Sequence, residues 1–260
     1  MNIVSLGAGV QSSVMALMAN EGILTPRPDC AIFADTGWEP PAIYEHLDWL
    51  EEKLDFPIYR VSGGNIRRDV ENGLNTTGQK FSSIPFYTEG GGMGRRQCTR
   101  EYKIDPIHRK VRELCGLEKY KKAPKGLNVY MWIGISRDEA TRAKESRHKW
   151  VTHIWPLIDI GYDRRDCLKW WNERFNRKLV KSSCIGCPFR NDAMWLDMKI
   201  NDPQSFEDAC EFDRIIRGSG TSQEAQYLHR SRLPLKDVDF STQENQPNLF
   251  ENECEGMCGV

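Results

Sequence analysis

The stretch that decides the fold is IVSLGAGVQSSVMALMA, residues 3–19 of the 260-residue chain. It begins with an apolar strand pattern, turns through glycines and continues as a helix from Gln11 to about Asn20. Such a strand-to-helix turn typically cradles a phosphate at the helix N-terminus. This one lacks the lysine of a P-loop, and its glycines do not match the dinucleotide-binding fingerprint. The stretch therefore predicts an anion-binding loop of another kind.

The alternation of strand and helix continues along the chain. Further strand patterns occur at CAIFAD (30–35), PIYRV (57–61) and VYMWIGI (129–135), with an amphipathic helix pattern over residues 41–54. This order predicts βαβ units in an α/β, Rossmann-like fold: a central, mainly parallel sheet with helices on both faces.

After residue 160 the pattern becomes helical, as in RRDCLKWWNERF and SFEDACEFDRIIR. We therefore expect three parts: a nucleotide-binding α/β core over residues 1–160, a helical C-terminal portion over 161–235, and a flexible acidic tail over 236–260.

Composition narrows the class of protein. The net charge is −1, with 39% hydrophobic and 28% charged residues, which argues against wholesale coating of nucleic acid. No apolar run reaches membrane-spanning length, and the first strand follows Met1 directly, leaving no room for a signal peptide. We expect a cytoplasmic protein. Its nine cysteines then favour metal ligands, redox thiols or buried hydrophobes over structural disulfides.

The glycine turn offers the first candidate site. Gly7, Ala8 and Gly9 let backbone N–H groups approach an anion, and Gln11, Ser12 and Ser13 add polar donors. A tight turn without a ligand is the alternative interpretation.

Two further motifs follow predicted strands, where ligands of such sheets bind. In DTGWEPP, Asp35 and Thr36 end a strand; Asp35 suits Mg²⁺ or a ribose hydroxyl, and a local Asx-turn is the alternative. In GISRDEATR, Gly134 ends a strand and Arg137 and Arg142 suit phosphate clamping, whereas the neighbouring carboxylates simply complement a helix dipole.

Between the third and fourth predicted strands lies the glycine-rich and arginine-rich stretch FYTEGGGMGRRQCTREYKIDP. Its glycines predict a mobile lid or substrate loop. From residue 95 to residue 125 there are eleven Lys or Arg and four Asp or Glu residues. This surplus favours a surface that receives a polyanion over a merely solvated helix face. The candidate substrate-binding residues are Arg95, Arg96, Arg100 and Lys103.

The cysteines fall into two groups with candidate chemistry. Cys184-x-x-Cys187 is compatible with zinc, an iron–sulfur cluster or a redox pair, and Cys98 in RQCTREYK adds a third thiol. Cys254 and Cys258 near the C-terminus predict a swinging dithiol, or else exposed thiols without a role. The other cysteines lie in strand or helix patterns, and we expect them in the core.

Taken in order, the glycine loop, DTGWEPP, RQCTREYKIDP and GISRDEATR resemble the PP-loop superfamily of adenine-nucleotide α-hydrolases. The most similar branch contains phosphoadenosine-phosphosulfate (PAPS) reductases and the sulfurtransferase of DNA phosphorothioation. The usual loop reads Ser-Gly-Gly-x-Asp-Ser, so Gly7 replaces a serine and Gln11 replaces the aspartate associated with Mg²⁺ and pyrophosphate. That departure makes nucleotide binding more secure than ATP cleavage.

The resemblance implies a ligand set. ATP, or the phosphosulfates PAPS or APS, would be bound with Mg²⁺ by Ser5, Gly7, Ala8, Gly9, Gln11, Ser12, Ser13, Asp35, Thr36 and Gly134. Cys98, Cys184 and Cys187 would hold a [4Fe–4S] cluster that leaves one iron open, with a structural Zn²⁺ as the competing chemistry. Arg137 and Arg142 would neutralise charge on the reacting phosphate.

Three functions remain open. The leading one is an ATP-dependent sulfurtransferase that adenylates a nucleotide or nucleic-acid substrate and takes sulfur from a donor protein. The second is a reductase of PAPS or APS that uses Cys254 or Cys258 as nucleophile. The third is an adenine-nucleotide-binding module without catalysis. No membrane partner is expected, and a homodimer fits any of the three.

Overall fold

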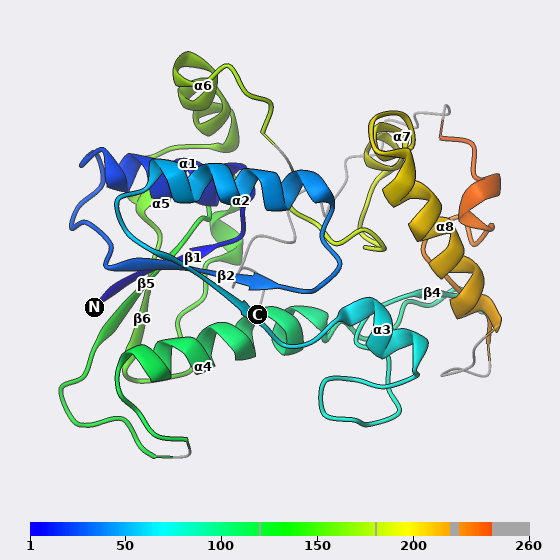
Figure 1. The fold of residues 1–260 in the computed structure, drawn as a ribbon, viewed down its shortest axis with the longest axis horizontal. Coiled ribbons are helices and arrows are strands. Elements are labelled where there is room, and N and C mark those ends of the chain that lie inside the picture. Colours follow the sequence, from blue (N-terminus) through cyan, green and yellow to red (C-terminus); the bar gives the residue numbers. More distant parts are fainter. Residues whose placement is uncertain (120, 180, 219–223, 241–260) are drawn as a thin grey trace.

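The computed structural model describes residues 1–119, 121–179, 181–218 and 224–240. Its centre is a five-stranded sheet in the order β3–β2–β1–β5–β6 (Figure 1). The strands are β1 (Asn2–Leu6), β2 (Cys30–Asp35), β3 (Ile58–Ser62), β5 (Val129–Ile133) and β6 (Val151–Ile154). All four pairings are parallel, so the carboxyl ends of the strands share one edge. The predicted α/β fold is confirmed, with β6 as a strand that the sequence patterns missed.

Helices cover both faces of this sheet, as Figure 1 shows. One face carries α1 (Val10–Asn20), α2 (Pro41–Lys53), α5 (Pro156–Asp159) and α6 (Arg164–Arg174). The other face carries α4 (Asp105–Leu114). Alternation along β1 explains the two layers, because Val4 and Leu6 pack toward α1 whereas Ile3 packs on the α4 side.

The C-terminal portion is helical, as predicted. It contains α7 (Asp192–Asn201), α8 (Pro203–Gly218) and the short turn η3 (Leu235–Asp237). These elements enclose a second apolar cluster around Trp195, Phe206 and Phe212. Trp38, which follows β2, packs into that cluster and so joins it to the sheet. The helix α6 behaves differently, because its Trp171 packs into the cluster beneath α1.

Short elements complete the fold. They are α3 (Ile66–Glu71), the π-helical turn η1 (Thr99–Ile104) that runs directly into α4, the 3₁₀ turn η2 (Arg137–Arg142), and the antiparallel pair β4 (Tyr87–Thr88) and β7 (Gln226–Tyr227). π-Helical turns are rare and are frequent at functional sites. Cys98 immediately precedes η1.

The glycine-rich stretch, predicted as a mobile loop, is held by backbone hydrogen bonds. Thr88 N donates to the carbonyl of Gly92 at 3.0 Å, and Gly91 N donates to that of Thr88 at 3.0 Å. The Arg232 guanidinium donates to the carbonyl of Gly91 at 3.1 Å. The stretch is therefore a tight turn at the end of the β4–β7 pair, fastened to the C-terminal portion.

The remaining cysteines occupy packed positions: Cys30 and Cys167 are buried, and Cys115 and Cys210 are half-buried. The predicted tail site at Cys254 and Cys258 lies outside the described residues. Within the part of the chain that the structure describes, no helix combines the length and the apolar character needed to cross a membrane.

Candidate active site

The glycine loop joins β1 to α1 at the carboxyl edge of the sheet. Ala8 has a positive φ of 55°, and Gly9 stands at the N-cap of α1 without a side-chain cap. The first turn of α1 carries no acidic residue. The N–H groups of a helix's first turn have no acceptor inside the helix, and the helix dipole favours negative charge there. The backbone of this loop can therefore bind an anion.

The polar side chains of the loop are bonded within the protein. Gln11, Ser12 and Ser13 are all at most 1% exposed. Ser12 Oγ accepts from Gly7 N at 3.2 Å and so stabilises the turn. Ser13 Oγ lies 2.9 Å from Nε2 of His46, a buried residue of α2. These contacts assign Ser12 and Ser13 to holding the shape of the loop.

Gln11 links three parts of the chain that are far apart in sequence. Its Nε2 lies 3.3 Å from Glu139 Oε2 and 3.4 Å from Ser136 Oγ, and its Oε1 accepts from Arg164 at 2.8 Å. Glu139 is buried, which raises the pKa of its carboxyl, while Arg142 at 3.0 Å opposes that rise. The carboxamide is thus held between a carboxylate and a guanidinium. Neither Glu139 nor Arg164 was expected at this site from the sequence.

Gly134 is required by a close approach of backbones. It follows β5, and a Cβ added to it would lie 2.8 Å from Ser12 N and 2.9 Å from Ser12 Cα. Real Cβ atoms do not come so close to backbone. The absence of a side chain at Gly134 therefore lets the end of β5 pack against the glycine loop.

Asp35 and Thr36 follow β2, next to the loop in the sheet. Asp35 Oδ1 accepts from Gly37 N at 2.7 Å and from the Tyr44 hydroxyl at 2.9 Å. Burial, and then the charge of Asp35, raise the pKa of Tyr44. The Gly37 contact is the Asx-turn that the sequence offered as the alternative interpretation. Thr36 faces elsewhere, because its Oγ1 lies 3.3 Å from Cys184 Sγ.

A buried polar group surrounds Cys184. Glu39 Oε1 accepts from the Thr36 hydroxyl at 3.0 Å and lies 3.6 Å from Cys184 Sγ. Lys103 Nζ lies 4.0 Å from the same carboxylate oxygen, and the Lys103 side chain is 7% exposed. Lys103, expected at the surface as a substrate-binding residue, therefore faces the interior beside Glu39.

The three predicted cysteine ligands converge on one cavity. Cys98, Cys184 and Cys187 all line it, together with Thr36 and Lys103. Cys184 and Cys187 belong to one turn, in which Cys187 N donates to the carbonyl of Cys184 at 3.2 Å. This turn packs on Trp38, whose carbonyl accepts from Ile185 N at 2.9 Å.

Cysteine thiolates are ligands for thiophilic groups, and three cysteines line this cavity together with the cationic side chains of Arg96 and Lys103. In the described ranges, no three Cys, His, Asp or Glu side chains are arranged to hold a metal ion. Thiolates that share one zinc ion must all lie about 2.3 Å from it. The cavity itself is small, about 20 Å³, which is room for about one water molecule.

The predicted arginines are spread over several places. Arg95 is exposed, and the guanidinium of Arg96 lies 5.0 Å from the ring centroid of Phe189. Arg100 is largely exposed, at 3.9 Å from Asp105. Arg137 is also exposed, with Asp163 at 3.8 Å, whereas Arg142 is mostly buried against Glu139. The structure thus brings Arg142, but not Arg137, into the network around Gln11.

A parallel sheet with a glycine loop at a helix N-terminus, where the strand order reverses between β1 and β5, defines an α/β nucleotide-binding protein. The chain belongs to the phosphoadenosine phosphosulfate reductase domain family, whose model matches residues 1–160. This family lies in the class of adenine-nucleotide α-hydrolase enzymes, and membership implies an adenine nucleotide as ligand.

A relative is found in a bacteriophage. The chain is 22% identical over 295 residues to an uncharacterized 37.8 kDa protein in the gpa 5′ region of Escherichia phage 186. The similarity covers 94% of this chain and 84% of the phage protein, so it extends well beyond the family's matched region.

Proposed function

We propose that this protein is an ATP-dependent sulfurtransferase that uses a thiolate-bound iron–sulfur cluster. The observation that carries the proposal is the convergence of Cys98, Cys184 and Cys187 on one cavity. The cavity also contains Thr36, the residue that follows β2, and β2 pairs with β1 directly before the glycine loop. A nucleotide on that loop and a sulfur carrier in that cavity would lie at the same edge of the sheet.

The proposed reaction has two steps. An oxygen of the acceptor attacks the α-phosphate of ATP, which forms an adenylated acceptor and releases pyrophosphate. Hydrosulfide then displaces AMP and leaves sulfur in place of that oxygen. A [4Fe–4S] cluster on three thiolates would supply an iron without a protein ligand, where hydrosulfide can bind.

The residues of this chain have separate tasks in the proposal. The backbone N–H groups from Gly7 to Gly9 and the first turn of α1 hold phosphate oxygens. Asp35, together with phosphate oxygens, would hold Mg²⁺. Arg142 stands next to the network of Gln11 and stabilises the negative charge that develops at the reacting phosphate.

The first experiment is anaerobic purification followed by measurement of iron, zinc, labile sulfide and visible absorption. We expect about four irons per chain and a broad band near ~400 nm. Cys184→Ala should lose both, whereas Cys210→Ala should keep both, because Cys210 does not line the cavity. Colourless protein with one zinc, or with neither metal, contradicts the proposal.

The family match itself favours a second candidate, a reductase of PAPS or APS. Its nucleophile would be Cys254 or Cys258, and it would need a thiol donor rather than ATP. Two assays distinguish the candidates. The sulfurtransferase should release pyrophosphate from ATP, and the reductase should release sulfite from the phosphosulfate in a thiol-dependent reaction. A chain truncated before Glu253 should lose the second activity and keep the first.

A further inference from the structure

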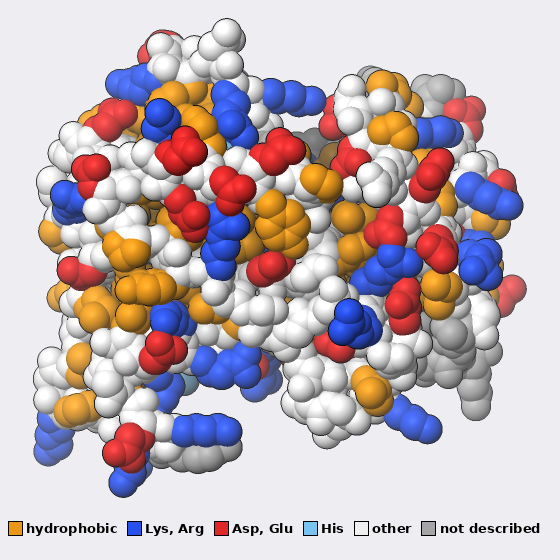
Figure 2. Space-filling view, in the orientation of Figure 1, with side chains coloured by type: hydrophobic (Ala, Val, Ile, Leu, Met, Phe, Trp, Pro, Cys, Tyr) orange, Lys and Arg blue, Asp and Glu red, His pale blue; other side chains and the backbone are white. Residues whose placement is uncertain are grey.

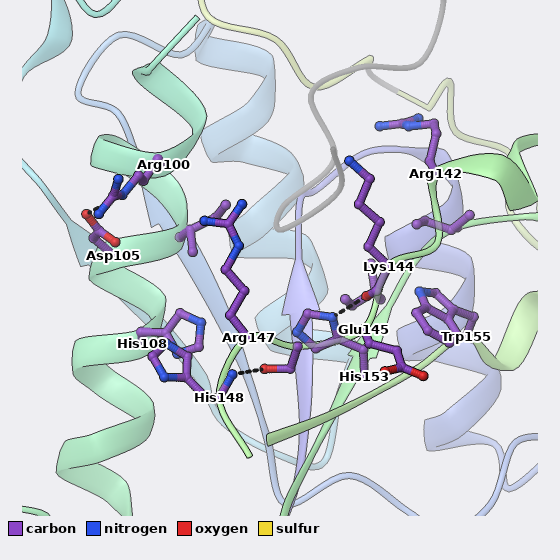
Figure 3. A pocket seen from close by; sticks show the side chains of 14 residues that line it. Arg100, Asp105, His108, Arg142, Lys144, Glu145, Arg147, His148, His153 and Trp155 are labelled. Atoms are coloured by element: carbon purple, nitrogen blue, oxygen red, sulfur yellow. Dashed lines mark hydrogen bonds and ion pairs between the residues drawn. The ribbon is translucent and has the colours of Figure 1, made fainter. Parts of the chain in front are cut away.

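A second cavity lies on the α4 side of the sheet, at the carboxyl ends of β5 and β6. Figure 3 shows it between η1 and α4 on one side and the segment that leads from η2 into β6 on the other. Its volume is about 240 Å³. A water molecule in the liquid occupies about 30 Å³, so the cavity has room for a small group of atoms rather than a single water. None of the predicted glycine-loop or cysteine residues lines it.

Positive charge dominates the walls of this cavity. Four cationic side chains line it, against the two carboxylates of Asp105 and Glu145; the cations are Arg100, Arg142, Lys144 and Arg147. Arg100 is near Asp105, and Arg142 is paired with Glu139. Among the described residues, neither Lys144 nor Arg147 has a carboxylate within ion-pair distance. Lys144 and Arg147 are thus cations at the cavity that make no ion pair within the described part of the protein.

Three ring nitrogens at the same cavity also lack a hydrogen-bond partner in the described structure. They are His108 Nδ1, His153 Nε2 and Trp155 Nε1, all buried. The His153 ring is fixed, because its Nδ1 donates to the carbonyl of Lys144 at 2.8 Å. A buried polar atom without a partner is costly, and such atoms call for a ligand or an ordered water. The Trp155 N–H can only donate, whereas His153 Nε2 donates only when the ring is protonated, because its Nδ1 already carries the donated proton. A bound anion would accept from the indole and would favour that protonation.

Burial and the neighbouring rings keep the His108 ring neutral. The rings of His108 and His148 lie 4.5 Å apart between centroids, and Figure 3 shows them against each other at the side of α4. Burial, and then the neighbouring rings of His148 and His153, lower the pKa of His108 to about 4. The cavity without a ligand therefore disfavours more positive charge, and a bound anion would remove that penalty.

We propose that this cavity binds a phosphate group, at a position separate from the glycine loop. Phosphate offers several strong acceptor oxygens for Lys144, Arg147 and the indole and imidazole N–H groups. It comes from free phosphate or from the terminal phosphate of a nucleotide or nucleic-acid substrate. The proposal concerns a different cavity from that of the cysteines and does not rest on sulfur transfer.

The five histidines of the chain make a direct test, because only His108, His148 and His153 line the cavity. Full-length protein labelled at the histidine rings is titrated with inorganic phosphate and followed by NMR. We expect the three cavity rings to shift and His229 to stay in place. His46 contacts Ser13 of the glycine loop, so a shift of His46 reports phosphate on that loop and not in this cavity. Potassium chloride at matched ionic strength should move none of the rings. Equal shifts with chloride, or cavity rings that do not respond to phosphate, overturn the proposal.

Variants of the cavity residues test whether the NMR shifts of the histidine rings report binding in this cavity. The double variant Lys144→Gln/Arg147→Gln removes two exposed charges and should raise the phosphate concentration for half-saturation about tenfold or more. Lys149→Gln is the matched control, since Lys149 is exposed on the same segment but does not line the cavity. A double variant that titrates like the wild-type protein refutes the site.

Two further ligands distinguish the sources of phosphate. A short oligonucleotide is compared with and without a 5′-terminal phosphate. If the phosphorylated form alone shifts the three rings, at lower concentration than inorganic phosphate, the cavity takes the terminal phosphate of an acceptor. If neither oligonucleotide acts but inorganic phosphate does, the cavity takes free phosphate.

Discussion

The buried His46 makes the stability of this protein depend on pH in a way that can be calculated. Its side chain lies between Trp49 and Trp171, with ring centroids 5.9 and 5.7 Å away, and it is not exposed to solvent. Burial, and then the charge of Arg177, lower the pKa of His46 to about 4. The ring is therefore neutral at pH 7 in the folded protein, with Ser13 Oγ at its Nε2.

The direction of the pH dependence follows from the pKa of His46 in the unfolded chain and in the folded protein. In the unfolded chain the pKa of histidine is about 6.5, so between pH 6.5 and 4 the unfolded chain binds the proton more tightly. Stability is complete above the unfolded pKa and falls as the pH drops toward the folded pKa. For a shift from about 6.5 to about 4, the loss from pH 7 to pH 5 is about 2 kcal/mol, and it levels off at about 3 kcal/mol at lower pH.

The assay is unfolding by urea at pH 7 and pH 5, for the wild-type protein and for His46→Gln. Other buried histidines, such as His108, weaken both proteins alike, so the difference between the two pH dependences isolates His46. We expect the variant to lose about 2 kcal/mol less than the wild-type protein over this interval.

Ser13→Ala is the matched control for this experiment. It removes the hydroxyl at His46 Nε2 but keeps the ring buried, and burial is the main cause of the lowered pKa. This variant should keep most of the wild-type pH dependence. Equal pH dependence in the wild-type protein and His46→Gln would refute the reasoning.

Two glycine substitutions test the close approaches around the site. Gly186→Ala would place a Cβ 2.2 Å from Trp38 Cη2, so unfolding should show a loss of about 1–3 kcal/mol, whereas Gly218→Ala, with no atom within 4 Å, should change stability little. Gly134→Ala would press on the backbone of Ser12 and displace the glycine loop. Calorimetric titration with ATP should then show binding weakened about tenfold, and unchanged affinity would remove the loop from the nucleotide site.

The sheet was predictable because its central strands β1, β2 and β5 are mostly apolar, as expected when helices cover both faces. The strand predicted at residues 30–35 has the bounds of β2, and the first strand follows Met1 directly, as predicted. The strand β6 was missed because it has only four residues, of which Thr152 and His153 are polar. Periodicity carries little information over so short a segment.

The candidate site was predictable only where a motif is local. The turns at Gly7–Gly9 and at Cys184–Cys187 are readable from neighbouring residues. Gln11 contacts Glu139 and Arg164, which are more than a hundred residues away in the sequence. No pattern among neighbouring residues could predict these contacts. The same holds for the contact between Gly186 and Trp38, which depends on how α8 and the sheet pack together.

The contact that Arg164 makes with Gln11 affects where this chain can be truncated. The family's matched region ends at residue 160, yet Arg164 reaches back to Gln11, and Trp171 of the same helix completes the packing beneath α1. A chain cut at residue 160 would expose the apolar face of α1 that Trp171 covers, and the Gln11 carboxamide would lose its contact with Arg164. We therefore expect the glycine loop and α6 to unfold together, and a chain cut at the family boundary to fold poorly.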